Sequence, residues 1–344
     1  MMKKKVTFAD VAAYTGFSKT TISRYFNDPD SLTLENQEKI QTALQELGYQ
    51  ENKLAKILAN GKSEFIGIIV PNLYLNFYAE MLELLLTTYE QCGYKFLVFP
   101  GSEKEDVERK YIHELLAYKI EGLIVLSHTI PSDELASYNV PIVAIERECD
   151  NICGVTTDNF KGGEMAARQL LACECDHYLH VNVHFPKSSP AYGRIVGFEQ
   201  TIQQAGKQPV IYQEDLGNSV HEIRIQLKQL FERIETQFPA EEKKGIFFAN
   251  DTYANIFLNL IFQKYGLLPD TYKLIGFDNS TASAEAILPI TTIAQQKEEM
   301  VHEAMQLLIR QMEGRKKRRP EPRFAPVQVE VEPLLIKRET TSLE

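Results

Sequence analysis

The first fifty residues carry three short apolar stripes, each with the period of a helix. The first stripe comprises Phe8, Val11 and Ala12. The second comprises Ile22, Tyr25 and Phe26. Gly16 separates these stripes, as expected of a residue that ends a helix, and a third helix is predicted between Thr33 and Gly48. Three short helices with one tight turn predict a helix-turn-helix domain.

The second predicted helix also has a polar face, which points away from its apolar stripe. The residues on this face are Lys19, Thr20, Thr21, Ser23 and Arg24. In a helix-turn-helix domain the second helix lies in the major groove, where Arg and Lys read guanine and hydroxyl groups read several base edges. The face therefore predicts contact with double-stranded DNA. A helical bundle whose polar face meets only water is the alternative that the spacing leaves open.

The segment after these helices reads as a linker. Asn52 can cap a short helix through Leu58, and Asn60-Gly61 would end it. One or two helical turns are not stable alone in water, so we expect this segment to fold only against a second copy of itself or against DNA. A plain connector between domains is the alternative.

From Phe65 onward, short apolar runs alternate with amphipathic segments. The predicted strands cover residues 65–70, 94–99, 122–126, 141–145, 178–183, 209–212, 245–249 and 272–277. The predicted helices cover residues 79–91, 104–118, 161–171, 192–205 and 252–265. Such alternation predicts an α/β fold of parallel sheets covered by helices. About 280 residues exceed one typical domain, so two lobes are expected.

The distribution of charge supports the DNA interpretation of the first segment. The whole chain has 37 basic and 47 acidic residues, a formal net charge of −10, which on average repels DNA. Residues 1–62 nevertheless contain nine basic and seven acidic side chains, with Lys3, Lys4 and Lys5 at the tip. The positive excess is therefore in the segment where phosphate contacts are expected.

Other motifs exclude several classes of protein. Cys173, Cys175 and His177 suggest a metal site, but they lack the C-x₂-C ligand spacing, so no metal is expected. The sequence contains no G-x-x-x-x-G-K-[ST], no G-x-S-x-G and no H-E-x-x-H, so neither an enzyme nor a cofactor is predicted. Five cysteines, an odd number, without a signal peptide or a long apolar run, predict a reduced cytoplasmic protein with no membrane segment.

Several motifs together resemble the LacI family of bacterial transcription regulators. They are Val6-Thr7, Asp10-Val11-Ala12, Gly16, Ser18, Thr21-Ile22-Ser23-Arg24, Asn27 and Leu47-Gly48-Tyr49, and the resemblance continues to residues 335–340. It implies a helix-turn-helix headpiece over 1–50, a hinge helix and linker over 51–63, and a two-lobed core like that of periplasmic binding proteins over 64–344. Lobe one is expected at about 64–162 and 294–322, and lobe two at about 163–293 and 323–340.

The resemblance implies DNA contacts from both the headpiece and the hinge. The matching positions are Thr7, Ser18, Lys19, Thr20, Thr21, Ser23, Arg24, Asn27, Asn52, Ala55 and Leu58. In the family, paired hinge helices of a dimer enter the minor groove, where an apolar side chain at the position of Leu58 wedges between bases. The chain departs from the family at Glu51, where a proline is usual, so a weaker hinge helix is expected.

The candidate ligand residues follow the predicted strands of the core, because ligands of open parallel sheets bind beyond the carboxyl ends of the strands. By this rule and the resemblance, the effector positions are Asn76, Phe77, Ser127, Arg147, Arg194, Asn250 and Asp278. An arginine fork, a carboxylate acceptor and an aromatic wall suit a polyhydroxyl ring, so a sugar is expected. A phosphosugar, a nucleobase and a phosphoprotein corepressor stay open, as do purely structural roles for Arg194 and Asp278.

A ligand-controlled DNA-binding repressor accounts for every segment of this sequence. A small-molecule binding protein without DNA function is the alternative, and an exported one would need a signal that residues 1–62 do not supply. The segment Met81–Tyr89 is apolar around too much of its circumference for one buried face. It therefore predicts a homodimer, which would bring two headpieces to a palindromic operator.

Overall fold

The structure, a computed structural model, describes residues 6–50, 63–101, 104–184, 186–316 and 325–342. The chain forms two compact units, Met1–Lys62 and Ser63–Glu344. Each unit has a hydrophobic core of its own.

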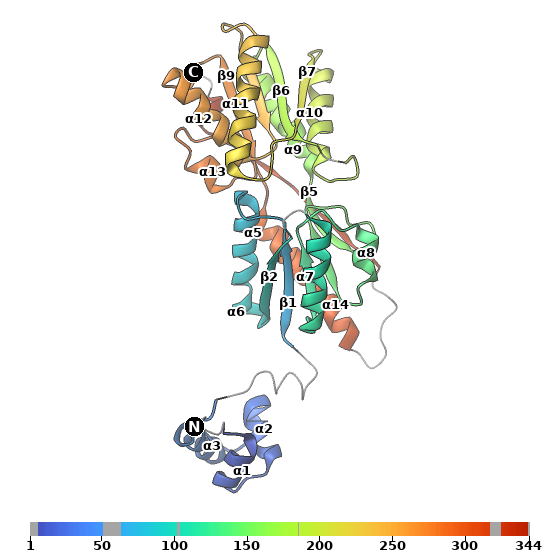
Figure 1. The fold of residues 1–344 in the computed structure, drawn as a ribbon, viewed down its shortest axis with the longest axis vertical. Coiled ribbons are helices and arrows are strands. Elements are labelled where there is room, and N and C mark those ends of the chain that lie inside the picture. Colours follow the sequence, from blue (N-terminus) through green and yellow to red (C-terminus); the bar gives the residue numbers. More distant parts are fainter. Residues whose placement is uncertain (1–5, 51–62, 102–103, 185, 317–324, 343–344) are drawn as a thin grey trace. The chain divides into compact units, whose positions relative to one another are not determined.

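The first unit is a small helical bundle (Figure 1). Its elements are α1 (Phe8–Thr15), α2 (Lys19–Asn27), the 3₁₀ turn η1 (Pro29–Ser31) and α3 (Leu34–Glu46). Its fully buried side chains are Val11, Ile22, Ile40 and Ala43. The Asp10 carboxylate accepts hydrogen bonds from the backbone nitrogen and the hydroxyl of Thr7, at 2.8 and 2.7 Å, and so fixes the start of α1. Gly16 ends this helix with φ of 76°, a left-handed conformation that glycine adopts without strain.

Lobe one of the second unit is built on a six-stranded parallel sheet in the order β11-β5-β4-β3-β1-β2. The strands are β1 (Phe65–Val70), β2 (Lys95–Pro100), β3 (Gly122–Val125), β4 (Ile142–Ile145), β5 (Cys153–Thr157) and β11 (Gln328–Val331). The helices are α5 (Asn76–Thr87), α6 (Tyr89–Cys92), α7 (Glu105–Ala117), α8 (Ser132–Ser137) and α14 (Lys297–Lys316). The side chains of α5 and α14 cover one face of this sheet, and those of α7 and α8 cover the other.

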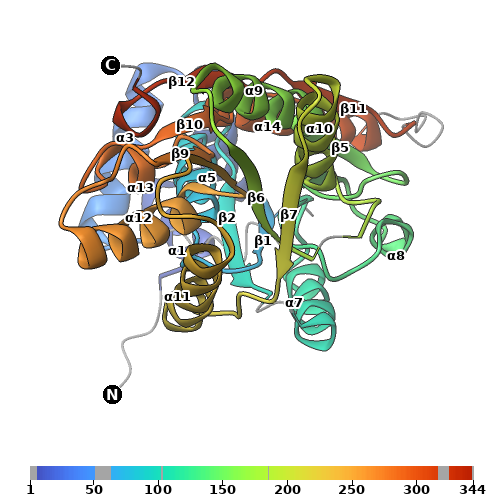
Figure 2. The ribbon, with the colours of Figure 1, turned by 90° about the horizontal axis from the view of Figure 1, so that it is seen from above.

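Lobe two repeats this plan with the order β12-β10-β9-β8-β6-β7. The strands are β6 (His177–Val183), β7 (Pro209–Glu214), β8 (Lys244–Phe248), β9 (Tyr272–Phe277), β10 (Thr291–Ala294) and the antiparallel β12 (Leu334–Ile336). The helices are α9 (Asn159–Ala172), α10 (Tyr192–Gln204), α11 (Val220–Gln237), α12 (Asp251–Tyr265), α13 (Thr281–Ala284) and the 3₁₀ turn η2 (Glu339–Thr341). In Figure 2, α9 and α10 lie on one side of this sheet, and α11 and α12 lie on the other.

The expected fold class, a helical headpiece followed by two lobes with parallel sheets, is confirmed. One expected boundary is wrong. The segment 323–340 was assigned to lobe two, but β11 pairs with β5 in the sheet of lobe one, and only β12 joins lobe two. The described chain therefore crosses between the lobes after β5, after β10 and between β11 and β12.

None of the helices in the described part of the chain combines the length and the apolar character that crossing a lipid bilayer requires.

Candidate ligand cleft and nucleic-acid interface

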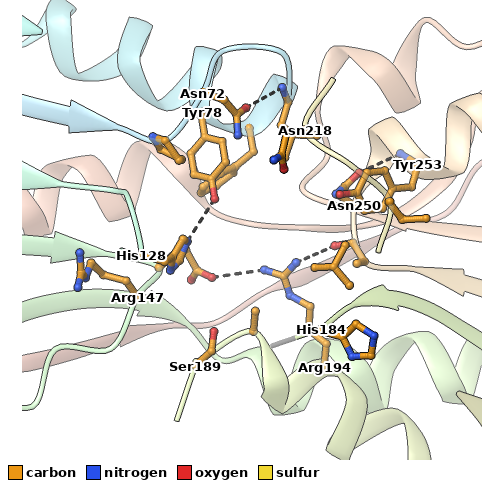
Figure 3. A pocket seen from close by; sticks show the side chains of 18 of the residues that line it. Asn72, Tyr78, His128, Arg147, His184, Ser189, Arg194, Asn218, Asn250 and Tyr253 are labelled. Carbon is orange, nitrogen blue, oxygen red and sulfur yellow. Dashed lines mark hydrogen bonds and ion pairs between the residues drawn. The ribbon is translucent and has the colours of Figure 1, made fainter. Parts of the chain in front are cut away.

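A cavity of about 720 Å³ lies between the two lobes, at the carboxyl ends of their strands (Figure 3). Lobe one contributes the loops after β1, β3 and β4, and lobe two contributes the loops after β6, β7, β8 and β9. This is where doubly wound α/β sheets bind their ligands, and the volume is typical of a small-molecule site. Of the seven predicted effector residues, Phe77, Arg147, Arg194, Asn250 and Asp278 line the cavity.

Arg194 bridges the two lobes. Its guanidinium group donates to Asn159 Oδ1 at 2.6 Å and to the carbonyl oxygen of Ala249 at 2.7 Å, and it lies 3.3 Å from Glu146 Oε2 in lobe one. It also stacks on the ring of Phe277, 3.6 Å from the ring centroid. The side chain is 7% exposed, so it reaches the cleft from a nearly buried position.

The position of Arg194 on α10 depends on two glycines at the contact between α9 and α10. A Cβ atom at Gly163 would lie 2.2 Å from the carbonyl oxygen of Arg194, and one at Gly197 would lie 2.0 Å from that of Phe160. Because no side chain fits there, the two helices touch backbone to backbone. This contact fixes the distance at which Arg194 enters the cleft.

Arg147 holds the loop after β3, and Ser127 is part of that loop. The guanidinium group of Arg147 donates to the carbonyl oxygens of Ser127 and Ile130, and Figure 3 shows it directed toward that loop. Ser127 is fully buried and is not among the lining residues. The prediction is therefore wrong for Ser127, because its hydroxyl is buried away from the cavity. Arg147 lines the cavity, but its donors already hold the loop in place.

The side chain of Asn76 bonds to lobe two and does not line the cavity, so the predicted ligand contact of Asn76 is wrong. Its amide donates to the hydroxyl of Thr281 at 2.9 Å and accepts from that of Thr252 at 3.3 Å, both in lobe two. The residue stands at the start of α5, and its side chain joins the lobes beside the cleft. The next residue, Phe77, lines the cavity but is 7% exposed and belongs chiefly to the core of lobe one.

Asn250 and Asp278 line the lobe-two side of the cavity. Asn250 caps α12, because its Oδ1 accepts a hydrogen bond from the backbone nitrogen of Tyr253 at 2.9 Å. Asp278 is buried and accepts a hydrogen bond from Gln295 Nε2 at 2.7 Å. Burial is the main cause that raises the pKa of the Asp278 carboxyl to about 8.

One pair of side chains on the lobe-one wall was not predicted from the sequence: the strand-end rule covers residues 71–78, and so Tyr78, but not its partner His128. The hydroxyl of Tyr78 lies 3.3 Å from Nε2 of His128, and Figure 3 shows the two groups meeting in the cavity. Although the His128 ring is accessible from the cleft, desolvation by the surrounding walls lowers its pKa to about 4, and the positive charges of Arg147 and Arg194 act in the same direction. The ring is therefore neutral at pH 7. The two residues are fifty positions apart, and no motif connects them.

The loop after β7 contributes Leu216, Gly217 and Asn218 to the lobe-two wall of the cavity, none of which is aromatic. Tyr74 and Leu75 of lobe one also line the cavity, and both pack against the hydrophobic core of lobe two. An aromatic wall is therefore supplied from the opposite lobe. Its position could not be read from the sequence, because it depends on how the lobes meet.

Carboxyl groups outnumber cationic groups in the cavity. Its acidic lining residues are Glu146, Glu148, Glu214, Asp215 and Asp278. Among the described lining residues, Arg147 and Arg194 are the only ones with permanently positive side chains, and both already hold protein oxygen atoms. The cavity therefore offers many hydrogen-bond acceptors and no cation that is uncommitted.

In the first unit, the predicted DNA face lies on α2 and its cap. Thr7, Ser18, Lys19, Thr20, Arg24 and Asn27 are exposed, and Thr21 and Ser23 are half-buried. Ser18 caps α2 by accepting a hydrogen bond from the backbone nitrogen of Thr21 at 3.1 Å. Asn27 donates to the carbonyl oxygen of Ser23 at 3.0 Å. Lys19, Thr20 and Arg24 are thus left to project from the helix. The hinge positions Asn52, Ala55 and Leu58 lie outside the described residues.

The cysteine cluster is structural where it is described. Cys173 and Cys175 are buried, and burial raises the pKa of both thiols. His177 lies in hydrogen-bonding contact with the carboxylate of Glu242. Among the described residues, no group of three or more His, Cys, Asp or Glu side chains is arranged to hold a metal ion.

A helix-turn-helix unit followed by a two-lobed α/β core with a cleft between the lobes defines a DNA-binding regulator with a ligand-binding core. Residues 7–52 match the family described as bacterial regulatory proteins, lacI family. Residues 63–240 match the periplasmic binding proteins and sugar binding domain of that family, and 168–341 match the periplasmic binding protein-like domain. The chain belongs to the LacI family, and it is a DNA-binding transcriptional regulator.

Individual relatives agree with this assignment. The chain is 31% identical over 306 residues to the sucrose operon repressor of Streptococcus mutans, which covers 88% of this chain and 92% of that protein. It is 27% identical over 309 residues to the ribose operon repressor of Halalkalibacterium halodurans, with 89% and 90% covered. The lac repressor dimer bound to operator and the anti-inducer ONPF has the same fold, with a TM-score of 0.81, 24% identity and 98% and 99% covered. A regulator from Alkaliphilus metalliredigens complexed with D-xylulofuranose matches with a TM-score of 0.67, 25% identity and 82% and 100% covered.

Proposed function

We propose that this regulator is a repressor that binds a palindromic operator as a homodimer, and that a neutral sugar in the cleft controls its affinity for DNA. The function requires no cofactor and no catalytic step, and it is exercised in the cytoplasm. An exposed edge formed by α5 and α6 supports the dimer, because Leu86 of α5 and Tyr89 of α6 are 41% and 48% exposed, while Met81 and Leu85 of α5 are buried.

The excess of hydrogen-bond acceptors in the cleft lining is the main observation in favour of a neutral sugar. Sugar hydroxyls donate hydrogen bonds, and the carboxylate and amide oxygens of the cavity accept them. A phosphorylated ligand would place a dianion in a cavity lined by Glu146, Glu148, Glu214 and Asp215, with both arginines already occupied. The relatives named above are repressors of sugar operons, which agrees with this choice. A nucleobase is the second candidate, because Tyr74, Tyr78 and Tyr253 could stack on a flat ring.

Within the cleft we propose that Arg194, Asn250 and Asp278 hold the sugar hydroxyls, with Phe77 behind the ring and Arg147 as support. In the headpiece we propose that Lys19, Thr20 and Arg24 read base edges, and that the ends of α2 contact the backbone. Asn52, Ala55 and Leu58 are proposed to contact the minor groove.

A thermal-shift screen of the full chain tests the effector class. The panel consists of sucrose, maltose, D-ribose and D-fructose, then glucose 6-phosphate and fructose 1-phosphate, then guanine and hypoxanthine. A ligand at a hundred times its Kd stabilises the folded state by about 2.7 kcal/mol, which raises the Tm measurably. We expect a shift from a neutral sugar and none from the phosphates. Stabilisation by a phosphorylated sugar alone, or by a purine alone, would refute the proposed effector class.

The same screen on Arg24→Ala provides a matched control. Arg24 is exposed on α2 in the other unit, so the ligand-induced shift should be unchanged while operator binding is weakened.

A further inference from the structure

Asp278 has few of the partners that a buried carboxylate needs. Its side chain is 5% exposed, and its backbone has φ of 108°, a conformation that side-chain-bearing residues rarely adopt. Its Oδ1 accepts one hydrogen bond, from the neutral amide of Gln295 at 2.7 Å. Within the described part of the chain, no lysine, arginine or histidine lies at ion-pair distance from its carboxyl group. A carboxylate buried in this way is costly in its charged form.

The cations near this loop are committed to other groups. The charged residues that act on Asp278 are Arg194, Lys297 and Asp251. Glu146 pairs with Arg194, Glu80 pairs with Lys297, and Arg338 donates to the adjacent Asn279. Arg194 lies 3.3 Å from Glu146, and the ammonium group of Lys297 lies 2.6 Å from Glu80. Lys297 also donates to the backbone carbonyl oxygen of Asp278 at 2.9 Å and not to its side chain. Desolvation by burial is the largest effect on the pKa of Asp278 and raises it, while the charges of Arg194 and Lys297 lower it by less. Arg338 donates its hydrogen bonds to neutral oxygen atoms.

A second buried carboxyl group, that of Asp251, lies against the same loop. It accepts hydrogen bonds from the hydroxyl of Thr292 at 2.6 Å, and from the backbone nitrogen and hydroxyl of Ser280 at 2.7 and 3.1 Å. The negative charge of Asp251 raises the pKa of Asp278, and of two buried carboxyl groups the one with more hydrogen-bond donors stays ionised to lower pH. Asp251 has three donors and Asp278 has one, so the proton resides on Asp278. The pKa values follow this order, because burial raises that of Asp251 to about 6 and that of Asp278 to about 8.

We propose that Asp278 meets the effector as a neutral carboxylic acid, so that the cleft presents a hydrogen-bond donor as well as an acceptor at this position. The ligand then places an oxygen that accepts a hydrogen bond, such as a ring or glycosidic oxygen or a hydroxyl, against Asp278. The inference rests on the proposed function in one respect only, namely that the effector occupies this cleft.

The protonation state is tested on the full chain without any ligand. The infrared spectrum at pH 7 should contain the carbonyl band of a protonated carboxylic acid that disappears by pH 10. The band should be absent from Asp278→Asn, in which an isosteric amide replaces the acid. Asparagine is also the residue best suited to a positive φ after glycine, so this variant is expected to fold. A wild-type spectrum without the band at pH 7, or an identical band in Asp278→Asn, would overturn the proposal.

Asp251→Asn is the matched second variant. Removing the charge of Asp251 should lower the pKa of Asp278, so the carbonyl band should titrate at lower pH than in the wild type. A purely structural role for Asp251 would leave that midpoint unchanged, and an unchanged midpoint would contradict the proposed effect of the Asp251 charge on Asp278.

The donor role is tested with whichever sugar of the sucrose, maltose, D-ribose and D-fructose panel binds the wild type. An amide can donate a hydrogen bond as a neutral carboxylic acid does, but it cannot supply the negative charge of a carboxylate. We therefore expect Asp278→Asn to keep the Kd within a few-fold, and Asp278→Gly, which tolerates the backbone conformation, to weaken it about tenfold or more. Equal weakening in both variants would overturn the donor role. If no sugar binds, the proposed effector class fails while the infrared result still decides the state of Asp278.

Discussion

Replacement of Arg194 by methionine should destabilise the core far more than the loss of a ligand contact alone would suggest. Glu146 is 5% exposed, and Arg194 is the cation beside it at 3.3 Å. Breaking a buried ion pair by removing one partner typically costs about 3–5 kcal/mol, because a charge is left uncompensated. The Glu146 carboxylate keeps hydrogen bonds from the backbone nitrogen of Thr157 and the amide of Asn159. We therefore expect the lower end of this range, about 3 kcal/mol.

The measurement is urea denaturation of the full chain at pH 7, followed by circular dichroism because the chain contains no tryptophan. Arg168→Met on the adjacent helix α9 is the matched control. Arg168 also pairs with a glutamate, Glu164, but its side chain is 67% exposed, so its removal should cost less than about 1 kcal/mol.

The double variant Arg194→Met with Glu146→Gln separates charge from packing. If the cost arises from the stranded carboxylate, neutralising Glu146 should recover most of it, and the interaction energy in the double-mutant cycle should lie at about 1–3 kcal/mol. Equal destabilisation by Arg194→Met and Arg168→Met would show that the bridge between the lobes contributes nothing beyond a surface pair. Additive effects of the two core substitutions would lead to the same conclusion.

Three further predictions follow from other parts of the molecule. Arg24→Ala should cost about 1–3 kcal/mol at the specific operator and almost nothing on random DNA, and an unchanged ratio of the two affinities in a filter-binding assay would exclude α2 as the recognition helix. Gly197→Ala should destabilise the core by about 1–3 kcal/mol, because its Cβ would lie 2.0 Å from the carbonyl oxygen of Phe160, and a Tm equal to that of the wild type would contradict the close contact of α9 and α10. Burial lowers the pKa of His180 to about 3, below the ordinary value of 6.5, so the folded state binds fewer protons than the unfolded state between these values and the free energy of unfolding falls as the pH drops below 6.5. His180→Gln should show a smaller loss of stability between pH 7 and pH 5, and an identical slope in urea titrations would refute the assignment.

The strands that the sequence predicted are those with several apolar residues in a short segment. β1 was predicted at its observed bounds, Phe65–Val70, because all of its residues except the first are buried and it lies in the interior of the sheet. β5, β10, β11 and β12 were missed, and each is only three to five residues long. β5 and β10 each contain two Thr residues, β11 alternates polar and apolar residues, and β12 has only three residues, so none carries a long apolar run. Each pairs with a strand of an existing sheet. Such strands depend on tertiary structure, which local periodicity does not encode.

The residues of the candidate site also fall into those that the local sequence indicates and those that only the tertiary structure places. Arg194 and Asp278 were found because short motifs surround them, and both line the cavity. Asn76 and Ser127 were predicted from their position after a strand, a rule that locates a loop but not the direction of each side chain. The pair of Tyr78 and His128 was not predicted, because their contact joins α5 to the loop after β3 and no spacing in the sequence indicates it.

Two of the residues proposed to hold the effector, Arg194 and Asp278, also take part in the contacts that join the lobes, and this links binding to conformation. Arg194 connects lobe two to Glu146 in lobe one, and Gln295 binds both Asp278 and the hydroxyl of Thr157. A ligand that takes hydrogen bonds from Arg194 or Asp278 therefore alters the groups that set the angle between the lobes. A ligand shifts such an equilibrium only by its difference in affinity for the two arrangements, and about 1–3 kcal/mol is usual for coupled sites. Because the bridges pass through the cavity itself, the difference in affinity arises at the binding site, and no separate relay is needed to transmit it between the lobes.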